Sequence, residues 1–193
     1  MILPIYAYGQ PILRKESEEI DKEYPNLSQL IEDMFETMDS AKGIGLAAPQ
    51  IGKNIRIIVV DSKKLSEDFD EPGLDEFRKV FINPIIEQEF GDDFTFREGC
   101  LSLPRISEEI TRKSKIILSY YDMDWNLHQE EFSGLKARII QHEYDHLEGI
   151  MWIDRASPLR RKLLQSKLLK ISKGDVYHDY LMKFVKKSKL FIT

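Results

Sequence analysis

The feature that most constrains this chain is the pentapeptide H-E-Y-D-H, in which His142 and His146 stand four residues apart. Four residues are about one helical turn, so both imidazoles lie on one side of a helix and face a common point. With a glutamate after the first histidine, the pattern is typical of a helix that holds a divalent metal and carries the general base of a hydrolase. The pentapeptide therefore predicts a helix and a metal-dependent hydrolase.

The residues before the pentapeptide favour a buried position for it. A helix that begins at residues 133–134 places on one face a series that is first apolar and then chemical: Leu135, Ile139, His142, Glu143 and His146. Short motifs also arise by chance, and a histidine on an apolar helix face is often only a core residue. A solvated helix, however, would place its histidines among lysines and glutamates. The pattern favours a buried metal site at the end of a core helix.

A catalytic site of this kind usually has three protein ligands and one open position, so a third ligand is needed. The only cysteine, Cys100, lies in the stretch E-G-C-L-S-L-P, whose glycine and proline indicate a loop or a strand end. A single cysteine forms no intrachain disulfide, and its ordinary role is that of a small buried hydrophobic residue. As a metal ligand it would give a Cys-His-His site with a charge-donating thiolate.

Three separated blocks resemble the motifs of the peptide deformylase family. The first is G-I-G-L-A-A-P-Q at residues 43–50, the second E-G-C-L-S at 98–102 and the third Q-H-E-Y-D-H at 141–146, in the family's order and spacing. The glycines of the first block do not indicate nucleotide binding, because the block lacks the lysine of a P-loop and the third glycine of a dinucleotide fingerprint. Length and strand pattern agree with the family from Met1 to about Asp154.

The resemblance implies a reaction and a role for each matching residue. The expected reaction is hydrolysis of the N-formyl group from the initiator methionine of nascent polypeptides, which releases formate. The expected metal ligands are Cys100, His142 and His146. The expected catalytic groups are Glu143 as base and then acid, and the Gln50 side chain and Leu101 backbone N–H as oxyanion donors. The expected substrate-binding residues are Ile44, Gly45, Leu135 and Ile139. Alone, Gln50 would be read as a surface loop residue.

The resemblance also implies Fe²⁺ as the metal, with Zn²⁺, Ni²⁺ or Co²⁺ as possible occupants. The sequence itself does not select among them, since Cys-His-His ligation suits several borderline ions. A thiolate beside ferrous iron further predicts loss of activity in air.

Periodicity predicts an α+β fold, with antiparallel or mixed sheets packed around the histidine helix. Helical spacing of apolar residues runs from Leu27 to Met38, and β-rich runs occupy residues 55–60, 80–86 and 116–121. Helices and strands do not alternate regularly, which argues against a parallel α/β sheet. Residues 66–76 are acidic, contain Pro72-Gly73 and break both periodicities, so we expect an exposed, mobile loop.

The charge distribution divides the chain into a catalytic part, residues 1–154, and a basic extension, residues 155–193. Residues 158–193 hold ten Lys or Arg and two Asp, a balance of +8, whereas the remaining 18 basic and 31 acidic residues give −13. Two apolar stripes, at residues 163–171 and 177–185, predict two amphipathic helices packed on the catalytic part. The basic residues either form a solvated face or contact ribosomal RNA. The candidates for that contact are Arg160, Arg161, Lys162, Lys167 and Lys170.

Composition agrees with a monomeric cytoplasmic enzyme of bacterial type. A chain of 193 residues with 42% hydrophobic content buries a sizeable core in one domain. No stretch is apolar enough to span a membrane, the first residues lack the features of a signal or transit peptide, and a single cysteine is atypical of a secreted protein.

Two other functions remain open at this point. A zincin-type protease shares H-E-x-x-H, but its third ligand is a histidine or carboxylate, and neither His128 nor His178 has the required spacing. A structural metal in an RNA-binding module would leave Glu143 and Gln50 without a task. One departure from the family concerns Arg138, one turn before His142, where an apolar residue is usual. Its side chain is expected either to extend outward to solvent or to narrow the pocket.

Overall fold

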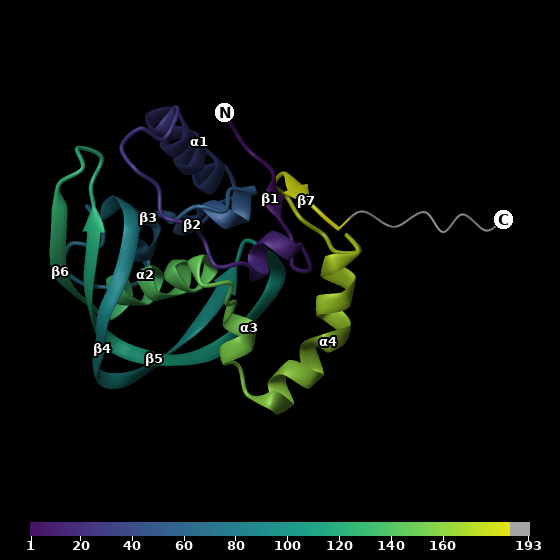
Figure 1. Cartoon of the computed structure of the whole chain (residues 1–193). Helices are drawn as coiled ribbons and strands as arrows, with labels where there is room; N and C mark the ends of the chain where they lie inside the picture. The colour runs from purple at the N-terminus through teal and green to yellow at the C-terminus, as the bar shows by residue number, and fades with distance from the viewer. Residues whose placement is uncertain (186–193) are drawn as a thin grey trace.

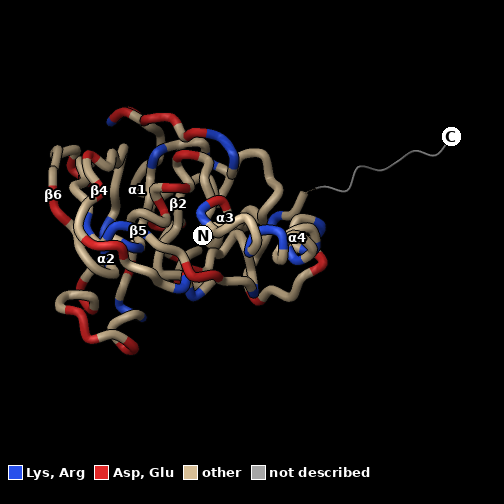
Figure 2. The backbone as a smooth tube through the Cα atoms, turned by 90° about the horizontal axis from the view of Figure 1, so that it is seen from below, with Lys and Arg blue, Asp and Glu red and all other residues tan. Residues whose placement is uncertain are grey.

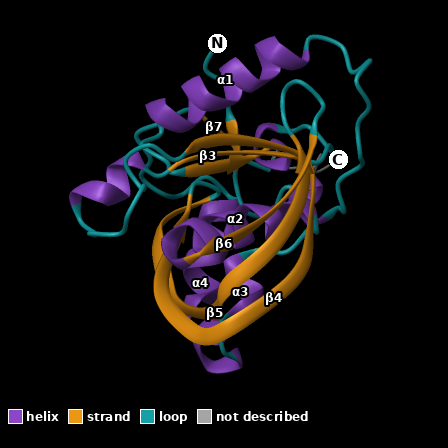
Figure 3. Cartoon of the chain, turned by 90° about the vertical axis from the view of Figure 1, so that its left-hand side faces the viewer, coloured by secondary structure: helices purple, strands orange, loops and turns teal. Residues whose placement is uncertain are grey.

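The computed structural model describes residues 1–185 and shows a curved sheet that encloses a helix (Figure 1). Five strands pair antiparallel in the order β2–β3–β4–β5–β6. They are β2 Gly45–Ala47, β3 Ile57–Asp61, β4 Arg78–Cys100, β5 Leu103–Tyr121 and β6 Leu127–Ser133. Figure 3 shows these strands wrapped around α2, Gly134–Leu147. The predicted α+β fold, with a sheet packed around the histidine helix, is confirmed.

The remaining elements lie outside this sheet. Helix α1 packs against β2 and β3, whereas β1 and β7 form a separate parallel pair. The helices are α1 Leu27–Ser40, α3 Trp152–Arg155 and α4 Pro158–Ser172, the two short strands are β1 Ile5–Tyr6 and β7 Met182–Lys183, and the 3₁₀ turns are η1 Pro11–Arg14, η2 Ala48–Ile51 and η3 Lys63–Glu67.

Helix α2 is held in the sheet by its apolar residues, as its sequence predicts. Ile139 and Ile140 belong to a buried cluster that also contains Phe81 of β4 and Ile116 of β5. Burial of one such side chain stabilises the fold by about 1.5–3 kcal/mol. Because these contacts fix the helix against β4 and β5, they also fix where its histidines point.

The sequence located most elements but not their full extent. The helix at 27–38 and the strand at 55–60 correspond to α1 and β3. The runs at 80–86 and 116–121 are only the outer ends of β4 and β5, which continue toward each other as one long hairpin. Many side chains in the continuation of β4 are exposed, so the apolar pattern used to detect strands is missing there.

The prediction of a helix over residues 177–185 is wrong. After α4, Gly174 has a φ of +75°, and the chain reverses and runs through bends at Val176, Asp179 and Tyr180 to the short strand β7. Ile5 N–H donates to the Leu181 carbonyl at 2.8 Å, and Ala7 N–H donates to the Lys183 carbonyl at 3.0 Å. The exposed edge of β1 therefore takes these residues as a strand, which overrides their helical spacing.

The first helix of the extension is present as α4 and packs on the rest of the molecule. Leu164, Leu168 and Ile171 are buried in a cluster that includes Leu103 of β5 and Trp152 of α3. Leu163, which we expected on the same stripe, faces solvent with 62% of its surface exposed. Among residues 1–185, no helix is long and apolar enough to cross a bilayer.

Candidate metal centre and active site

Three predicted ligands, from two elements, meet at one point. Cys100 ends β4, while His142 and His146 lie one turn apart on α2. Their ligand atoms all lie within 4.8 Å of one another, and the Cys100 Sγ is 3.3 Å from His146 Nε2. Burial raises the pKa of the Cys100 thiol, but the neighbouring His146 and His142 outweigh burial and lower the pKa to about 5. A thiolate beside two imidazoles is a donor set that fits a divalent transition metal.

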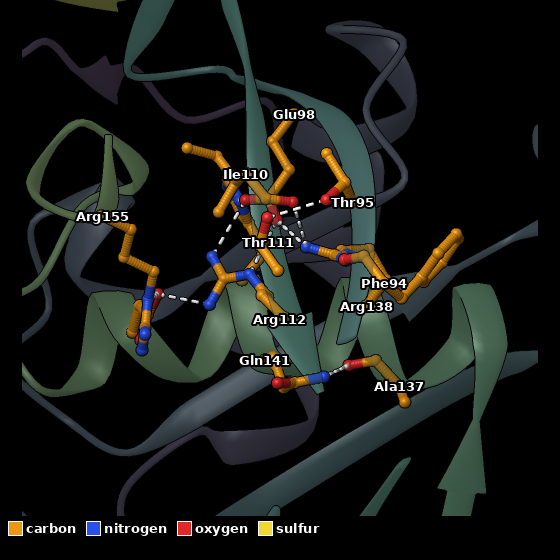
Figure 4. Close-up of polar contacts among 12 residues, drawn as sticks. Phe94, Thr95, Glu98, Ile110, Thr111, Arg112, Ala137, Arg138, Gln141 and Arg155 are labelled. Carbon is orange, nitrogen blue, oxygen red and sulfur yellow. Dashed lines mark hydrogen bonds and ion pairs between the residues drawn. The ribbon is translucent and has the colours of Figure 1, made fainter. Parts of the chain in front are cut away.

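A buried ion-pair network orients His142 for this role. Figure 4 shows Glu98, Arg112 and Arg138 of this network. Glu98 accepts a hydrogen bond from His142 Nδ1 at 2.8 Å, which leaves Nε2 of the ring for a metal. Arg112 donates to both carboxylate oxygens of Glu98, at 2.7 and 2.9 Å, and to Asp145 at 2.7 Å. Burial raises the pKa of Glu98, but Arg112 and His142 outweigh that effect and hold it far below its usual range. Glu98 is therefore a fixed anion behind the histidine.

Arg138 joins the same network rather than extending to solvent. Its side chain is 3% exposed and donates to Glu98 at 2.8 Å, to the Ile110 carbonyl at 3.0 Å and to the Phe94 carbonyl. The outward orientation that the sequence left open is excluded. The guanidinium lies over the Phe94 ring, 5.0 Å from its centroid, and the residue lines the pocket described below.

Gln50 and Glu143 line the same cavity as Cys100 and His142, Gln50 from η2 and Glu143 from α2. Gln50, on η2, is 1% exposed; its Oε1 accepts from Ala47 N–H at 2.8 Å, and its Nε2 lies 3.5 Å from the Cys100 Sγ. Gln50 is thus a buried site residue, not a surface one. Burial raises the pKa of Glu143 to about 7, and its Oε2 has no hydrogen-bond partner among residues 1–185. A buried carboxylate oxygen left free in this way is suited to accept a proton.

All four predicted substrate-binding residues line one cavity of about 530 Å³ beside the ligands: Ile44, Gly45, Leu135 and Ile139. Leu101, Gln50, Cys100, His142 and Glu143 line the same cavity. A Cβ atom at Gly45 would lie 2.8 Å from Glu143 Cδ, so glycine at this position makes room for the Glu143 carboxylate.

The acidic loop is largely exposed, as expected, but several contacts anchor it. The Glu71 carboxylate accepts from the Leu135 backbone N–H, at 3.0 and 3.2 Å, at the start of α2. Leu74 is fully buried. At the edge of the cavity, the Phe69 ring packs edge-on against Phe96, which lines the cavity, with centroids 5.5 Å apart.

Sequence reasoning missed several residues of the site. Glu98 and Asp145 lie inside the recognised motifs but were given no role, and Arg112 was not considered. A signal existed for Arg112, because Ile106, Glu108, Ile110 and Arg112 alternate along β5 as its buried positions. A charge at an inward position of a strand indicates a buried partner. No signal pointed to residues 178–180 of the extension, which also line the cavity.

Comparison with known proteins agrees with this geometry. The family model "Polypeptide deformylase" matches residues 2–162. A peptide deformylase of Christiangramia forsetii is 48% identical over 189 residues, 95% of this chain and 96% of the relative, and one of Cytophaga hutchinsonii is 46% identical over 184 residues, 95% and 98%.

Solved structures show the same similarity in three dimensions. A plant peptide deformylase is 36% identical with a TM-score of 0.80, covering 90% of each chain. The enzyme from Legionella pneumophila is 34% identical with a TM-score of 0.77, covering 91% of this chain and 98% of the other. The chain therefore belongs to the peptide deformylase family of metal-dependent hydrolases, which remove the N-formyl group from nascent polypeptides.

Proposed function

We propose that this chain carries out the family reaction at the cavity described above, with Cys100, His142 and His146 as metal ligands and Glu143 as general base. The observation that carries the proposal is the convergence of the three ligand atoms within 4.8 Å of one another, in a cavity lined by Glu143 and Gln50. A closed structural site would give neither Glu143 nor Gln50 a reason to lie in this cavity.

Each side chain then has a defined part in the reaction. A divalent ion held there supplies a Lewis acid and lowers the pKa of water. Glu143 takes the proton of the attacking water and delivers it to the leaving amine, so one carboxylate serves as base and then as acid. The Gln50 amide and the Leu101 backbone N–H donate hydrogen bonds to the oxygen of the formyl group as negative charge develops there. Ile44, Leu135 and Ile139 supply apolar surface for the methionine side chain.

The proposal is tested by formate release from a formyl-Met peptide with anaerobically purified protein. Glu143→Ala is expected to abolish formate release while leaving the ligands and the fold in place. A substrate with only an internal peptide bond runs in parallel, since its cleavage would favour a zincin-type protease instead. If metal-replete, folded protein cleaved neither substrate, the site would be structural.

We further propose Fe²⁺ as the bound ion, with Zn²⁺, Ni²⁺ or Co²⁺ as alternatives. The Cys-His-His donors suit all of them, so metal availability during synthesis decides occupancy. Elemental analysis after anaerobic purification identifies the ion. Iron-loaded protein should lose activity in air through oxidation of the iron or of Cys100, and unchanged activity after prolonged aeration would argue against iron.

We propose secondly that the basic extension, residues 155–193, contacts the ribosome. The extension follows the catalytic part, residues 1–154. The proposal is supported by exposed lysines on α4 and by the nascent chain as substrate. We also propose that this protein is a monomer and that it works in the cytoplasm, beside bacterial-type ribosomes. Light scattering during gel filtration tests the monomer.

A further inference from the structure

The chain after α4 returns to the active site through residues 176–185, which bend at Val176, Asp179 and Tyr180 before they reach β7. Its odd-numbered residues are exposed, whereas the even-numbered ones are half-buried: Val176, His178, Tyr180, Met182 and Phe184. Alternation with a period of two is that of a strand with one face on the protein. Val176, Met182 and Phe184 pack on the buried cluster beneath α4, and His178 and Tyr180 line the cavity.

Tyr180 makes a direct contact with a residue of the predicted oxyanion site. Its hydroxyl donates a hydrogen bond of 2.7 Å to the Leu101 carbonyl, across 79 positions of the chain. Burial raises the pKa of the Tyr180 phenol, so the group stays protonated and remains a donor at neutral pH. The donor, Tyr180, lies outside all three recognised motifs.

Leu101 needs such a contact because it lies in the short turn between β4 and β5. The neighbouring Ser102 is held twice, by Tyr8 N–H on its carbonyl at 2.9 Å and by Gln50 Nε2 on its hydroxyl at 3.3 Å. The Leu101 side chain packs against Gly43, where a Cβ atom would approach it to 2.8 Å. Tyr180 holds the Leu101 carbonyl, which lies in the peptide plane after the Cα of Leu101, whereas the Leu101 N–H lies in the plane before it. The hydrogen bond therefore acts on the N–H through the φ and ψ angles of Leu101, which the packed side chain and the contacts of Ser102 also restrict.

We infer that Tyr180 is a positioning residue for deformylation, which fixes Leu101 so that its backbone N–H faces the formyl oxygen. The inference rests on the proposed function. It extends the active site to a part of the chain beyond residue 162, where the match to the family model ends. An oxyanion donor stabilises the transition state only when it is held in place beforehand, and that is what the hydrogen bond from Tyr180 supplies.

The test compares Tyr180→Phe, which removes only the hydroxyl, with Tyr177→Phe. Tyr177 lies on the same segment but is 69% exposed and contacts Arg105 through its ring face, which phenylalanine retains. Kinetics use a formyl-Met dipeptide and a formyl-Met tetrapeptide. Tyr180→Phe is expected to lower kcat about three- to tenfold, as for loss of one hydrogen bond, with KM unchanged and the same loss on both substrates. Tyr177→Phe is expected to match the wild type.

A readout independent of activity comes from the Leu101 carbonyl itself. In protein labelled with ¹³C at leucine carbonyls, the Leu101 resonance should move in Tyr180→Phe and stay in Tyr177→Phe. An unchanged kcat in folded Tyr180→Phe would overturn the inference, because the contact would then be only structural. A rise in KM confined to the tetrapeptide would overturn it as well, since Tyr180 would then be a wall for later residues. If wild-type protein released no formate, the proposed function itself would fail.

Discussion

Glu98 is a buried carboxylate surrounded by Arg112, Arg138 and His142, and its position explains how the site stays charged in the interior. A buried anion without partners costs several kcal/mol, whereas one with several hydrogen bonds is retained. The arrangement fixes the tautomer of His142, since Nδ1–H points at Glu98. A ligand held in this way loses little freedom when it binds a metal.

Removing the charge of Glu98 should weaken the metal site. Glu98→Gln keeps the shape of the side chain but removes the anion that orients His142. Loss of such a hydrogen-bond partner of a ligating histidine typically weakens metal affinity about 10- to 100-fold. Competition with a chelator measures the change. Glu109→Gln is the matched control, because Glu109 is exposed on β5. Its ion pair with Arg97 is an exposed surface pair with a long separation of 3.9 Å. Equal chelator midpoints for both variants would show that Glu98 does not tune the site.

Gln50→Ala should be slow but folded. The substitution removes the side-chain oxyanion donor, which in comparable sites lowers kcat about 100- to 1,000-fold. It also leaves the Ala47 N–H without its acceptor, so we expect a loss of about 1–3 kcal/mol in stability. Formate-release kinetics and thermal unfolding measure the two effects separately. A kcat within a fewfold of the wild type would remove Gln50 from the mechanism.

Residue types and local spacing were sufficient to predict that Cys100, His142, His146 and Glu143 lie together, because two blocks of a few residues contain them all. Their roles in the reaction remain a proposal. The partners of these residues could not be predicted so well. Arg112 contacts Glu98 across 14 positions and Asp145 across 33, and Tyr180 reaches Leu101 across 79. Such pairs depend on how the elements pack, which a single sequence expresses only through weak patterns of burial.

At the scale of elements, α2 shows how a distant loop completes a helix. Ser133, its N-cap residue, makes no side-chain cap, and Gly134 takes a φ of +58° to start the helix. The Glu71 carboxylate instead accepts from the Leu135 N–H. A negative charge at this end also interacts favourably with the helix dipole. The acidic loop therefore stabilises the helix that carries the proposed ligands His142 and His146.

Glu71→Ala should lower stability by about 1 kcal/mol, the usual effect of losing a cap. For a chain of this size that corresponds to a decrease of about 2–4 °C in Tm. Glu76→Ala, an exposed change in the same loop, is the control and should leave Tm unaltered. The same Tm for both variants would mean that water replaces Glu71 at the helix end without loss.

Local pattern was sufficient for some elements, whereas residues 176–185 depend on long-range strand pairing. α1 and α4 each bury one face with helical spacing, and β3 is a short run of buried β-branched residues, so local pattern is sufficient to locate them. The segment 176–185 has aromatic and aliphatic residues at both helical and strand spacing. Only the free edge of β1 decides between them, and the sequence of the segment carries no trace of that edge.

For the whole molecule, the separation of charge is the property that bears on partners. Figure 2 shows Lys and Arg on α4, and the −13 balance of residues 1–157 lies elsewhere. Two of the predicted ribosome contacts have partners within the protein: Arg160 pairs with Glu108 at 2.6 Å, and Arg161 donates to the Asp154 carbonyl at 3.2 Å. The exposed Lys162, Lys167 and Lys170 are thus the better candidates for phosphate contacts.

Truncation of the extension would not test this proposal cleanly, since Leu164, Leu168 and Ile171 fill the core and Tyr180 reaches the cavity. Replacing Lys162, Lys167 and Lys170 with glutamine removes three charges and leaves those contacts intact. Each phosphate contact contributes about 0.7–0.9 to the steepness of the slope of log affinity against log salt concentration. In ribosome cosedimentation, the slope measured for this variant should therefore be less steep than that of the wild type by up to about 2–3.

The control for this variant is an equal loss of charge elsewhere, at the exposed Lys15, Lys22 and Lys53. Both triple variants should hydrolyse a short formyl-Met peptide at the wild-type rate, because none of the six lysines lines the cavity. If both weakened cosedimentation equally, only net charge would matter, and α4 would have no special part in it. A loss confined to the α4 variant would locate the contact on that helix, because the two variants carry the same net charge.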